Sequence, residues 1–383
     1  MKIALVHDQL QEFGGAERVL VSFKKIFPEA DVITSFYNPG KLGHQGKVTE
    51  NWHIITSWAD KIPLLKKLYS PLRFITPKIW ESFDLSNYNI VISSSGSYMC
   101  KGVITKPNTV HICYLHHPPR YLYGYETAIE WQKHKLIKIY GHFINHFLRM
   151  WDYTSSQRPK FFIANSEETQ KRIRKFYHRD SVVIYPPVSI PNNYQANGYQ
   201  PSELEGKPKT NGYYLTVSRL ARAKHIDVLI KAANKYQFNL KIVGAGRDEK
   251  YLKSLAGQTI DFLGSVNDKK MPEIYQNAKA FLFSAVDEEF GIAPVEAMGY
   301  GLPVIAYKSG GLTETVKENI NGFLFNELSP ESLIVKIKLI ESLPKEKLTE
   351  MSINSRKISE QFSEEIFERK IREYVDNCLK RSK

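Results

Sequence analysis

The sequence predicts an α/β protein with two domains, each built on a parallel β-sheet. Its 383 residues exceed what one ordinary hydrophobic core needs and suit two domains of middling size. In both halves, short apolar runs typical of strands alternate with helical segments, which favours parallel sheets. A composition of 42% hydrophobic and 24% charged residues fits a globular chain rather than a disordered one.

The first half contains a strand–helix–strand unit followed by further strands. The expected strands are residues 3–6, 31–35, 89–93, 110–115 and 161–165, and the first expected helix is residues 16–27. Gly14 and Gly15 lie between the first strand and that helix, where glycine lets the backbone pass close to a ligand. Such glycine pairs occur in many strand-to-helix turns, so this pair alone is weak support for a binding site.

The second half repeats this order after a segment rich in Asn, Gly, Pro and Gln. We expect a first domain at residues 1–190, a linker at 191–211, a second domain at 212–362 and a final helix at 363–383. The expected strands are residues 213–217, 240–243, 278–283 and 302–306. Arg219 and Lys224 lie between the first of these strands and the helix 226–235. They could bind a diphosphate, although two solvated cations are the simpler explanation of the pair alone.

Residues 284–306 are the most informative stretch. Pro294 suits the first turn of a short helix, and Gly301 suits the position just after its end. Glu288 then lies in the loop before the helix and Glu296 inside its first turns. The helix N-terminus favours an anion, and carboxylates on each side could hold hydroxyl groups. A phosphate joined to a polyol indicates a sugar nucleotide, whereas two glutamates without this setting would be ordinary surface charges.

In its setting, the Glu288–Glu296 spacing resembles the E-x7-E motif of the large retaining glycosyltransferase family with the GT-B fold. The matching residues are Phe290-Gly291, Pro294, Glu296-Ala297, Gly301-x-Pro303-Val304-Ile305, Arg219-x4-Lys224 and Gly310-Gly311-x-x-Glu314. The resemblance covers nearly the whole chain. It implies two Rossmann-like domains facing a cleft, with the donor held by the second, the acceptor by the first, and the last helix returning to the first domain.

The resemblance also implies roles for individual residues. Glu288 should contact the donor sugar and Glu296 the ribose, while Arg219 and Lys224 should neutralise the leaving diphosphate. The other donor-binding positions that it implies are Gly14, Gly15, Gly244, Gly264, Val266, Phe290, Gly291, Ile292 and Val295. Gly244 to Gly246 alone would be a weak motif, because it lacks the third glycine of a dinucleotide fingerprint.

The run His116-His117-Pro118-Pro119-Arg120-Tyr121 follows the strand 110–115. Ligands of open α/β sheets bind outside the carboxyl ends of strands, although a lone histidine is more often structural. The run resembles the His-x-Pro-x-Arg-Tyr signature of a bacterial GDP-mannose-dependent mannosyltransferase branch. It implies a catalytic His116 that also binds the acceptor together with Arg120. His117 and Pro119 depart from that branch, which leaves the acceptor preference open.

A formal net charge of +13 calls for an anionic partner. The expected helix 133–151 has Lys133, Lys135, Lys138 and Arg149 and no acid up to Met150. It suits either an anionic membrane interface or a core helix with a basic outer face. No apolar run reaches the length of a transmembrane helix, the N-terminus lacks a signal peptide, and three scattered cysteines suit a reduced compartment. We therefore expect a cytoplasmic protein, which would be peripheral on the inner face of the membrane if this helix faces lipid rather than the core.

The expected function is transfer of mannose from GDP-mannose to a glycan or a lipid-linked acceptor. No cofactor or metal is expected, since no Asp-x-Asp occurs in the chain. A UDP-sugar transferase and a GT-B epimerase are alternatives among enzymes. A basic nucleic-acid-binding protein is an alternative of another class, but it leaves Glu288 and Glu296 unexplained; no nucleic-acid partner is expected.

Overall fold

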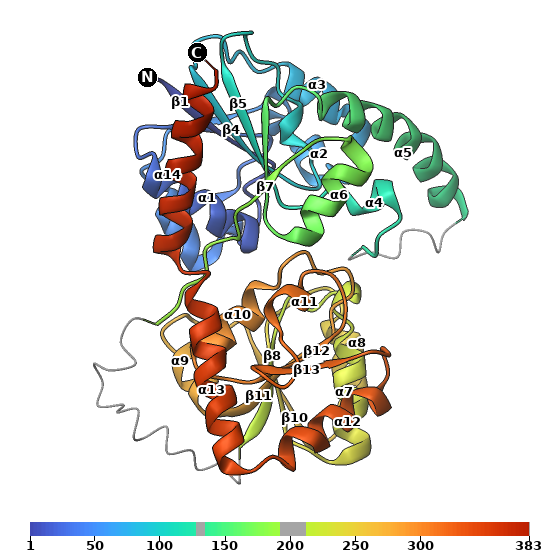
Figure 1. Cartoon of the computed structure of the whole chain (residues 1–383). Helices are drawn as coiled ribbons and strands as arrows, with labels where there is room; N and C mark the ends of the chain where they lie inside the picture. The colour runs from blue at the N-terminus through green and yellow to red at the C-terminus, as the bar shows by residue number, and fades with distance from the viewer. Residues whose placement is uncertain (128–134, 192–211, 383) are drawn as a thin grey trace. The chain divides into compact units, whose positions relative to one another are not determined.

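Two parallel β-sheets, one in each half of the chain, form the framework of the computed structural model (Figure 1). The structure describes residues 1–127, 135–191 and 212–382. Unit 1 comprises Met1–Tyr125, Trp131–Pro187 and Glu365–Lys383, and unit 2 comprises Glu126–Glu130 and Val188–Glu364. Apart from Pro191, the expected linker lies outside the described residues, as does the start of the expected helix 133–151.

The sheet of unit 1 has the strand order β3-β2-β1-β4-β5-β6-β7, with every pair parallel. Its central strands β4 and β5 are buried along their whole length, because helices and loops cover both faces. The strands are β1 (Ile3–His7), β2 (Asp31–Thr34), β3 (Ile54–Thr56), β4 (Ile90–Ser95), β5 (Val110–Leu115), β6 (Phe161–Ala164) and β7 (Val182–Val183).

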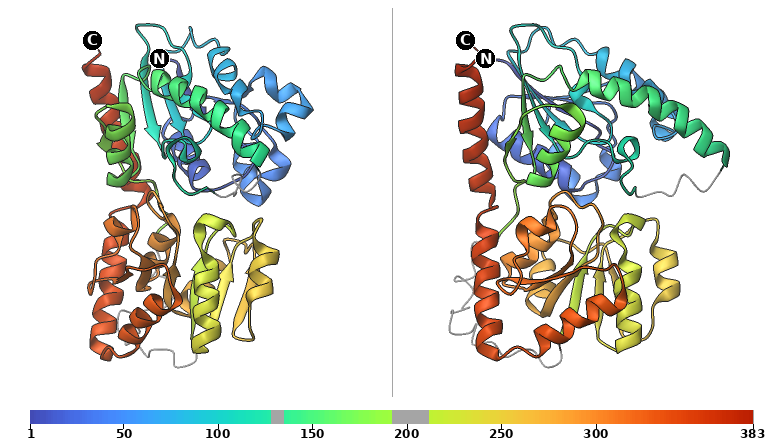
Figure 2. Two further views of the ribbon diagram at one scale, coloured as in Figure 1. Left: turned by 90° about the vertical axis from the view of Figure 1, so that its right-hand side faces the viewer. Right: turned by 45° about the vertical axis from the view of Figure 1, so that its right-hand side comes forward.

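The helices of unit 1 come from both ends of the chain. They are α1 (Gly15–Ile26), α2 (Pro63–Lys67), α3 (Thr76–Glu81), α4 (Arg120–Tyr123), α5 (Lys135–Ser155), α6 (Glu167–Tyr177) and α14 (Glu364–Lys380). Helix α14 packs on α1 and the sheet: its Phe367 ring lies 5.6 Å from the Phe23 ring and 6.0 Å from the Tyr114 ring, centroid to centroid. Figure 2 shows α14 and α5 on different sides of unit 1.

The sheet of unit 2 has the order β10-β9-β8-β11-β12-β13 and is also parallel throughout. Its strands are β8 (Tyr213–Val217), β9 (Leu240–Val243), β10 (Ile260–Gly264), β11 (Ala278–Phe283), β12 (Val304–Tyr307) and β13 (Gly322–Phe325). Its helices are α7 (Ile226–Tyr236), α8 (Glu249–Leu255), α9 (Met271–Gln276), α10 (Ile292–Gly299), α11 (Leu312–Thr315), α12 (Pro330–Glu341) and α13 (Lys345–Glu360). The prediction of two α/β units with parallel sheets is confirmed.

Each sheet has one point where the strand order reverses. In unit 1 it lies between β1 and β4, and in unit 2 between β8 and β11. Loops that leave two such strands diverge to opposite faces of the sheet and open a crevice at the carboxyl edge, where ligands of doubly wound folds bind. The candidate residues of both units lie at this edge of their sheets, some directly after these strands and others after β5, β9 or β10. None of the helices in the described part of the chain is long and apolar enough to cross a bilayer.

Candidate active site

In unit 2, the loops that follow β8 and β11 are fastened to each other at the reversal point. The Ser284 hydroxyl donates to the backbone carbonyls of Lys224 and His225, both at 2.9 Å. The backbone N–H of Val286 donates to the carbonyl of Ala223 at 3.1 Å. These bonds bring together two stretches that lie about sixty residues apart in sequence. The first stretch holds Lys224, and the second runs on to Glu288.

Lys224 and Glu288 form an ion pair at this point. Lys224 Nζ lies 2.6 Å from Glu288 Oε2, and the two side chains are 19% and 16% exposed. The ammonium group also lies 5.6 Å from the centre of the Phe283 ring. The resemblance assigns Lys224 to the diphosphate of the donor and Glu288 to its sugar, and the structure places the two side chains in direct contact. Arg219 lies in the same loop as Lys224, and its side chain is exposed.

A glycine turn supports the backbone of Glu288. Gly311 N–H donates to the Glu288 carbonyl oxygen at 2.8 Å. A Cβ atom at Gly310, whose φ is +55°, would lie 2.1 Å from that same oxygen, and one at Gly311 would lie 2.1 Å from the Glu289 oxygen. Only glycine permits so close an approach of two backbones. The turn at Gly310 and Gly311 therefore fixes where the Glu288 loop lies.

Helix α10 carries Glu296, Ile292 and Val295, and Phe290 lies just before it. The helix begins after Gly291, which offers no side-chain cap to its first N–H groups. Glu296 accepts a long hydrogen bond, 3.4 Å, from the Tyr275 hydroxyl. Phe290 and Val295 are 3% and 0% exposed and pack into the interior, so they offer a ligand only their backbone. Ile292 is half-buried at the start of the helix.

The remaining unit 2 candidates lie at or just beyond the ends of β9 and β10, at the same edge of the sheet. Gly244 N–H donates to the Gly264 carbonyl at 2.8 Å. A Cβ atom at Gly244 would lie 1.9 Å from the Ser218 oxygen, because this loop packs on the loop that holds Arg219. Val266 lies half-buried just beyond β10.

In unit 1, His116 directly follows β5 and is 8% exposed. Its Nε2 lies 2.8 Å from the Ser94 hydroxyl at the end of β4. Arg120 begins α4 and is half-buried. Gly14 and Gly15 follow β1, and Gly14 N–H donates to Glu17 Oε2 at 2.8 Å. These candidates therefore lie in loops at or next to the reversal point of their own sheet.

Sequence reasoning missed a carboxylate that organises this edge of unit 1. Asp8, directly after β1, accepts hydrogen bonds from the backbone N–H groups of Gly96, Tyr98 and Cys100 at 2.8–2.9 Å. Three such bonds fix the loop after β4. His7, Glu17 and Ser94 were also missed as site residues. For His7 and Ser94 the available signal was a polar residue at the end of an apolar strand, which is unusual inside a buried sheet.

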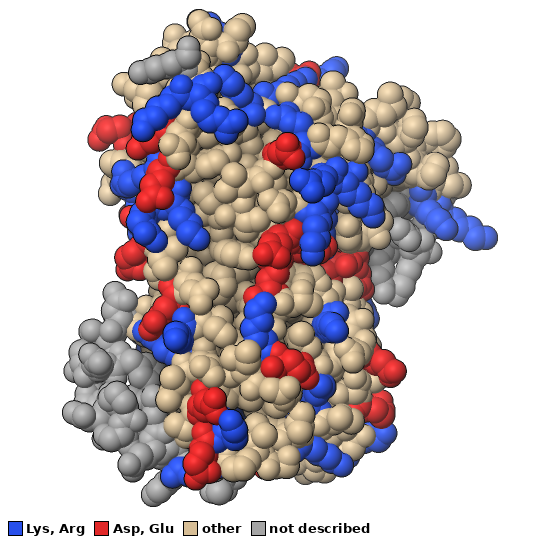
Figure 3. Space-filling model, in the orientation of Figure 1, with Lys and Arg blue, Asp and Glu red and all other residues tan. Residues whose placement is uncertain are grey.

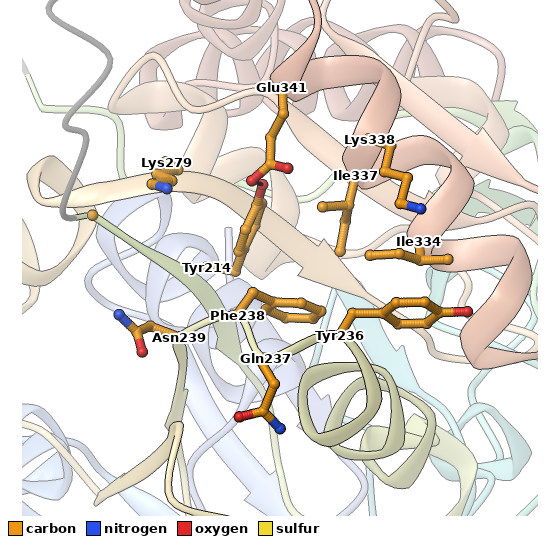
Figure 4. A pocket seen from close by; sticks show the side chains of 11 residues that line it. Tyr214, Tyr236, Gln237, Phe238, Asn239, Lys279, Ile334, Ile337, Lys338 and Glu341 are labelled. Atoms are coloured by element: carbon orange, nitrogen blue, oxygen red, sulfur yellow. Dashed lines mark hydrogen bonds between the residues drawn. The ribbon is translucent and has the colours of Figure 1, made fainter.

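A cavity of about 430 Å³ lies elsewhere in unit 2, at the amino edge of the sheet. Figure 4 shows Tyr214 and Glu341 pointing toward each other there, and the Tyr214 hydroxyl donates to Glu341 Oε1 at 2.8 Å. Burial, more than Glu341 itself, raises the pKa of Tyr214. Lys224 and Glu288 lie beyond the opposite ends of these strands, so the cavity is separate from the candidate site.

Two family models match this chain. The model of Glycosyltransferase Family 4 matches residues 13–190, and the model of Glycosyl transferases group 1 matches residues 202–358. Each match falls on one half of the chain, and each half contains one parallel sheet. Together, the matches and the fold identify the chain as a glycosyltransferase of the GT-B type.

Individual relatives are similar at low identity. The human Alpha-1,3/1,6-mannosyltransferase ALG2 is 27% identical over 245 residues, and the match spans 57% of this chain and 57% of that protein. An uncharacterized glycosyltransferase of Haemophilus influenzae is 26% identical over 366 residues, which cover 91% of this chain and 92% of that one. Anabaena Alr3699/HepE, solved in complex with UDP, has a TM-score of 0.68 at 21% identity and covers 98% of this chain and 100% of its own.

Proposed function

We propose that this protein transfers mannose from GDP-mannose to a glycan or lipid-linked acceptor, with retention at the anomeric carbon and without a metal ion. The observation that carries the proposal is the Lys224–Glu288 ion pair at the reversal point of unit 2. It joins a cation suited to a diphosphate and a carboxylate suited to sugar hydroxyls in one place. A nucleotide-sugar donor contains both a diphosphate and sugar hydroxyls.

The chemistry follows from the charge that develops on the leaving group. As the bond to the sugar breaks, negative charge accumulates on the diphosphate, and Lys224 and Arg219 offset it. Without donor, Lys224 and Glu288 neutralise each other, so neither half-buried charge is left unpaired. With donor, Lys224 gains a second anionic partner, and the free oxygen of Glu288 accepts from sugar hydroxyls. His116 contacts the reacting sugar.

The choice of mannose and guanosine is the finer part of the proposal. It is supported by the run from His116 to Tyr121 and by similarity to the human mannosyltransferase, of which the match spans 57%. The HepE structure was solved with UDP, which makes UDP-sugars the donors to compare. At 21% identity that similarity concerns the fold alone.

Thermal unfolding with candidate ligands tests the proposal. A ligand at concentration L that binds only the folded protein stabilises it by RT ln(1 + L/Kd), so at equal concentrations the tighter ligand gives the larger rise in melting temperature. We expect a rise with GDP-mannose that exceeds the rise with UDP-glucose or UDP-N-acetylglucosamine, and none with single-stranded DNA. A larger rise with a UDP-sugar contradicts GDP-mannose as the donor. A rise with DNA and with none of the nucleotide sugars contradicts the assignment as a glycosyltransferase. The anomeric configuration of the product, measured by NMR, then tests retention.

We also propose that unit 1 docks on an anionic membrane through α5. The helix buries Leu148 and Asp152 but leaves Ile139, Phe143 and Phe147 57–65% exposed. The Tyr140 hydroxyl donates to the Pro71 carbonyl at 2.6 Å and so joins α5 to a neighbouring segment, where Leu64, Leu68 and Phe74 are exposed. Exposed aromatic groups beside lysines suit a lipid interface. On the visible face of unit 1, Lys and Arg gather in several groups (Figure 3).

The cations of this surface differ in how much they can contribute. Lys135, Lys138 and Lys67 are exposed. Lys66 instead pairs with Asp60 at 2.8 Å, and the guanidinium of Arg73 stacks 4.0 Å from the centre of the Tyr121 ring. Cations held within the protein gain little from an anionic leaflet, so docking relies on the exposed lysines.

We predict salt-sensitive flotation of the protein with phosphatidylglycerol vesicles. Each exposed lysine near the leaflet contributes on the order of 1 kcal/mol, screened over a Debye length. The double variant Lys135→Glu with Lys138→Glu should lose flotation at low salt, and Phe143→Ser with Phe147→Ser should weaken it at any salt. Lys345→Glu with Lys357→Glu, on α13, makes the same charge change in unit 2 and should float like the wild type. Equal flotation of the α5 variants contradicts the proposal.

A further inference from the structure

A chain of hydrogen-bonded polar side chains runs through unit 1 from the glycine turn to His116. Gly14 N–H donates to Glu17 Oε2 at 2.8 Å, and Glu17 Oε1 lies 3.4 Å from His7 Nε2. His7 Nδ1 lies 3.1 Å from Ser94 Oγ, and Ser94 Oγ lies 2.8 Å from His116 Nε2. Every side chain from Glu17 to His116 thus touches the next one.

These side chains are held in place by the sheet. His7 ends β1 and is paired in register with Ser94 on β4, and His116 follows β5, the next strand in the sheet. His7 and Ser94 are each 1% exposed, His116 is 8% exposed and Glu17 is 9% exposed. Buried polar groups need hydrogen-bond partners, because an unpaired one costs roughly 1–3 kcal/mol. These side chains supply hydrogen-bond partners to one another.

The carboxylate at one end sets the direction of every hydrogen bond. An ionised Glu17 can only accept, so His7 must carry its proton on Nε2. A neutral His7 then accepts on Nδ1, and the Ser94 hydroxyl donates to it. The Ser94 oxygen in turn accepts from His116, which must carry its proton on Nε2.

We propose that Glu17, acting through His7 and Ser94, determines which ring nitrogen of His116 carries the proton. Glu17, His7 and Ser94 are positioning residues, and they make Nδ1 of a neutral His116 the accepting nitrogen. A carboxylate that sets a histidine tautomer is a recurring device in catalysis, here spread over two intervening side chains. The consequence for turnover rests on the proposed function, in which His116 contacts the reacting sugar.

The variant Glu17→Gln should exchange donor and acceptor in each hydrogen bond from His7 to His116. Its single carbonyl oxygen is the only atom that can accept from Gly14 N–H, so its NH₂ group faces His7 Nε2. His7 must then accept on Nε2 and carry its proton on Nδ1, which donates to Ser94. The Ser94 hydroxyl now donates to His116 Nε2, and the proton of His116 moves to Nδ1.

Nitrogen NMR of histidine-labelled protein reads this change directly. We expect the two ring nitrogens of His116 to exchange their protonated and unprotonated chemical shifts in Glu17→Gln, and to stay unchanged in Glu29→Gln, an exposed acid beyond α1. A wild-type His116 that carries its proton on Nδ1, or a Glu17→Gln spectrum identical to the wild type, overturns the proposal. The signal of His116 is identified by its loss in His116→Gln.

Ser94→Ala provides a second variant that does not depend on the folding of Glu17→Gln. It removes the hydroxyl that lies 2.8 Å from His116 Nε2, so the two ring nitrogens of His116 should shift away from their wild-type values toward a mixture of the two tautomers. A Ser94→Ala spectrum of His116 identical to the wild type overturns the proposal.

Kinetics separate this inference from the proposed function. With a sugar donor that the wild type uses, Glu17→Gln should lower kcat at least about tenfold with little change in the donor KM. This is expected when the change affects an interaction that His116 makes only in the transition state. Exchanged His116 nitrogens with an unchanged kcat support the tautomer control and count against the role of His116 in transfer.

Discussion

Glu288→Gln should lower kcat/KM at least about a hundredfold, the loss typical of removing one preorganised polar group from the transition state. The substitution keeps the size of the side chain but removes the charge that pairs with Lys224 at 2.6 Å. It also replaces one of two strong acceptors for sugar hydroxyls with a donor. The fold should be retained, because Gly311 N–H holds the backbone of this residue rather than its side chain.

Steady-state kinetics and thermal unfolding, measured together, check this prediction. Glu346→Gln is the matched control, since Glu346 is an exposed acid in the first turn of α13 in the same unit. It should leave both measurements unchanged. Full activity of Glu288→Gln at an unchanged melting temperature would show that the carboxylate does not serve the donor.

The strands that the sequence predicted well share one property. The expected ranges 213–217, 240–243 and 278–283 coincide with β8, β9 and β11. Each is a mostly apolar run of strand length, bounded by polar residues or glycine, so composition alone reveals it. In unit 1, β5 was predicted with the same accuracy, at residues 110–115.

The elements that were not predicted lack this signal. Strand β3 has three residues, all half-buried, and β13 begins with a glycine. Helix α13 packs on α10, yet its buried residues are Met351, Ser355 and Ser359. Two serines on the buried side leave almost no hydrophobic periodicity to detect. Tertiary packing, rather than local pattern, decides such elements.

Helix α5 illustrates another limit of the pattern. The sequence left open whether the apolar residues of this helix face lipid or the core, and the structure divides them: Leu148 is 2% exposed, while Phe143 and Phe147 are more than 60% exposed. The buried side of the helix instead includes Asn145, which donates to the Tyr121 carbonyl at 3.2 Å. Hydrophobicity alone cannot assign a helix face when polar side chains find buried partners.

The candidate site shows what one sequence leaves out. The sequence singled out both Lys224 and Glu288, since each follows a strand in a recognisable loop. Their contact depends on β8 and β11 being neighbours in the sheet. The chain from Glu17 to His116 depends in the same way on β1, β4 and β5 being adjacent. Strand order is a property of the fold, so side-chain partners at a sheet edge become visible only in three dimensions.

Lys224→Met should lower kcat/KM at least tenfold, because a charge-assisted hydrogen bond to a diphosphate contributes roughly 1.5–3 kcal/mol. Methionine keeps an unbranched side chain of nearly the same length and removes the ammonium group, which lies 5.6 Å from the centre of the Phe283 ring. Arg219→Ala should cause a loss of similar size by the same mechanism. Both losses should appear in donor binding as well as in turnover, since the diphosphate is charged in the ground state.

The double variant Lys224→Met with Glu288→Gln tests whether the two side chains act together on the donor or contribute independently. Because the two side chains touch, removing one already disturbs the other, and the combined loss should be smaller than the product of the single losses. Lys253→Met is the matched control: Lys253 pairs with Glu249 at 2.7 Å on α8 and is about half exposed. It should retain wild-type kinetics. Wild-type kinetics in Lys224→Met would instead place the phosphate site elsewhere in unit 2. The Lys224–Glu288 ion pair would then serve only to hold the two loops together.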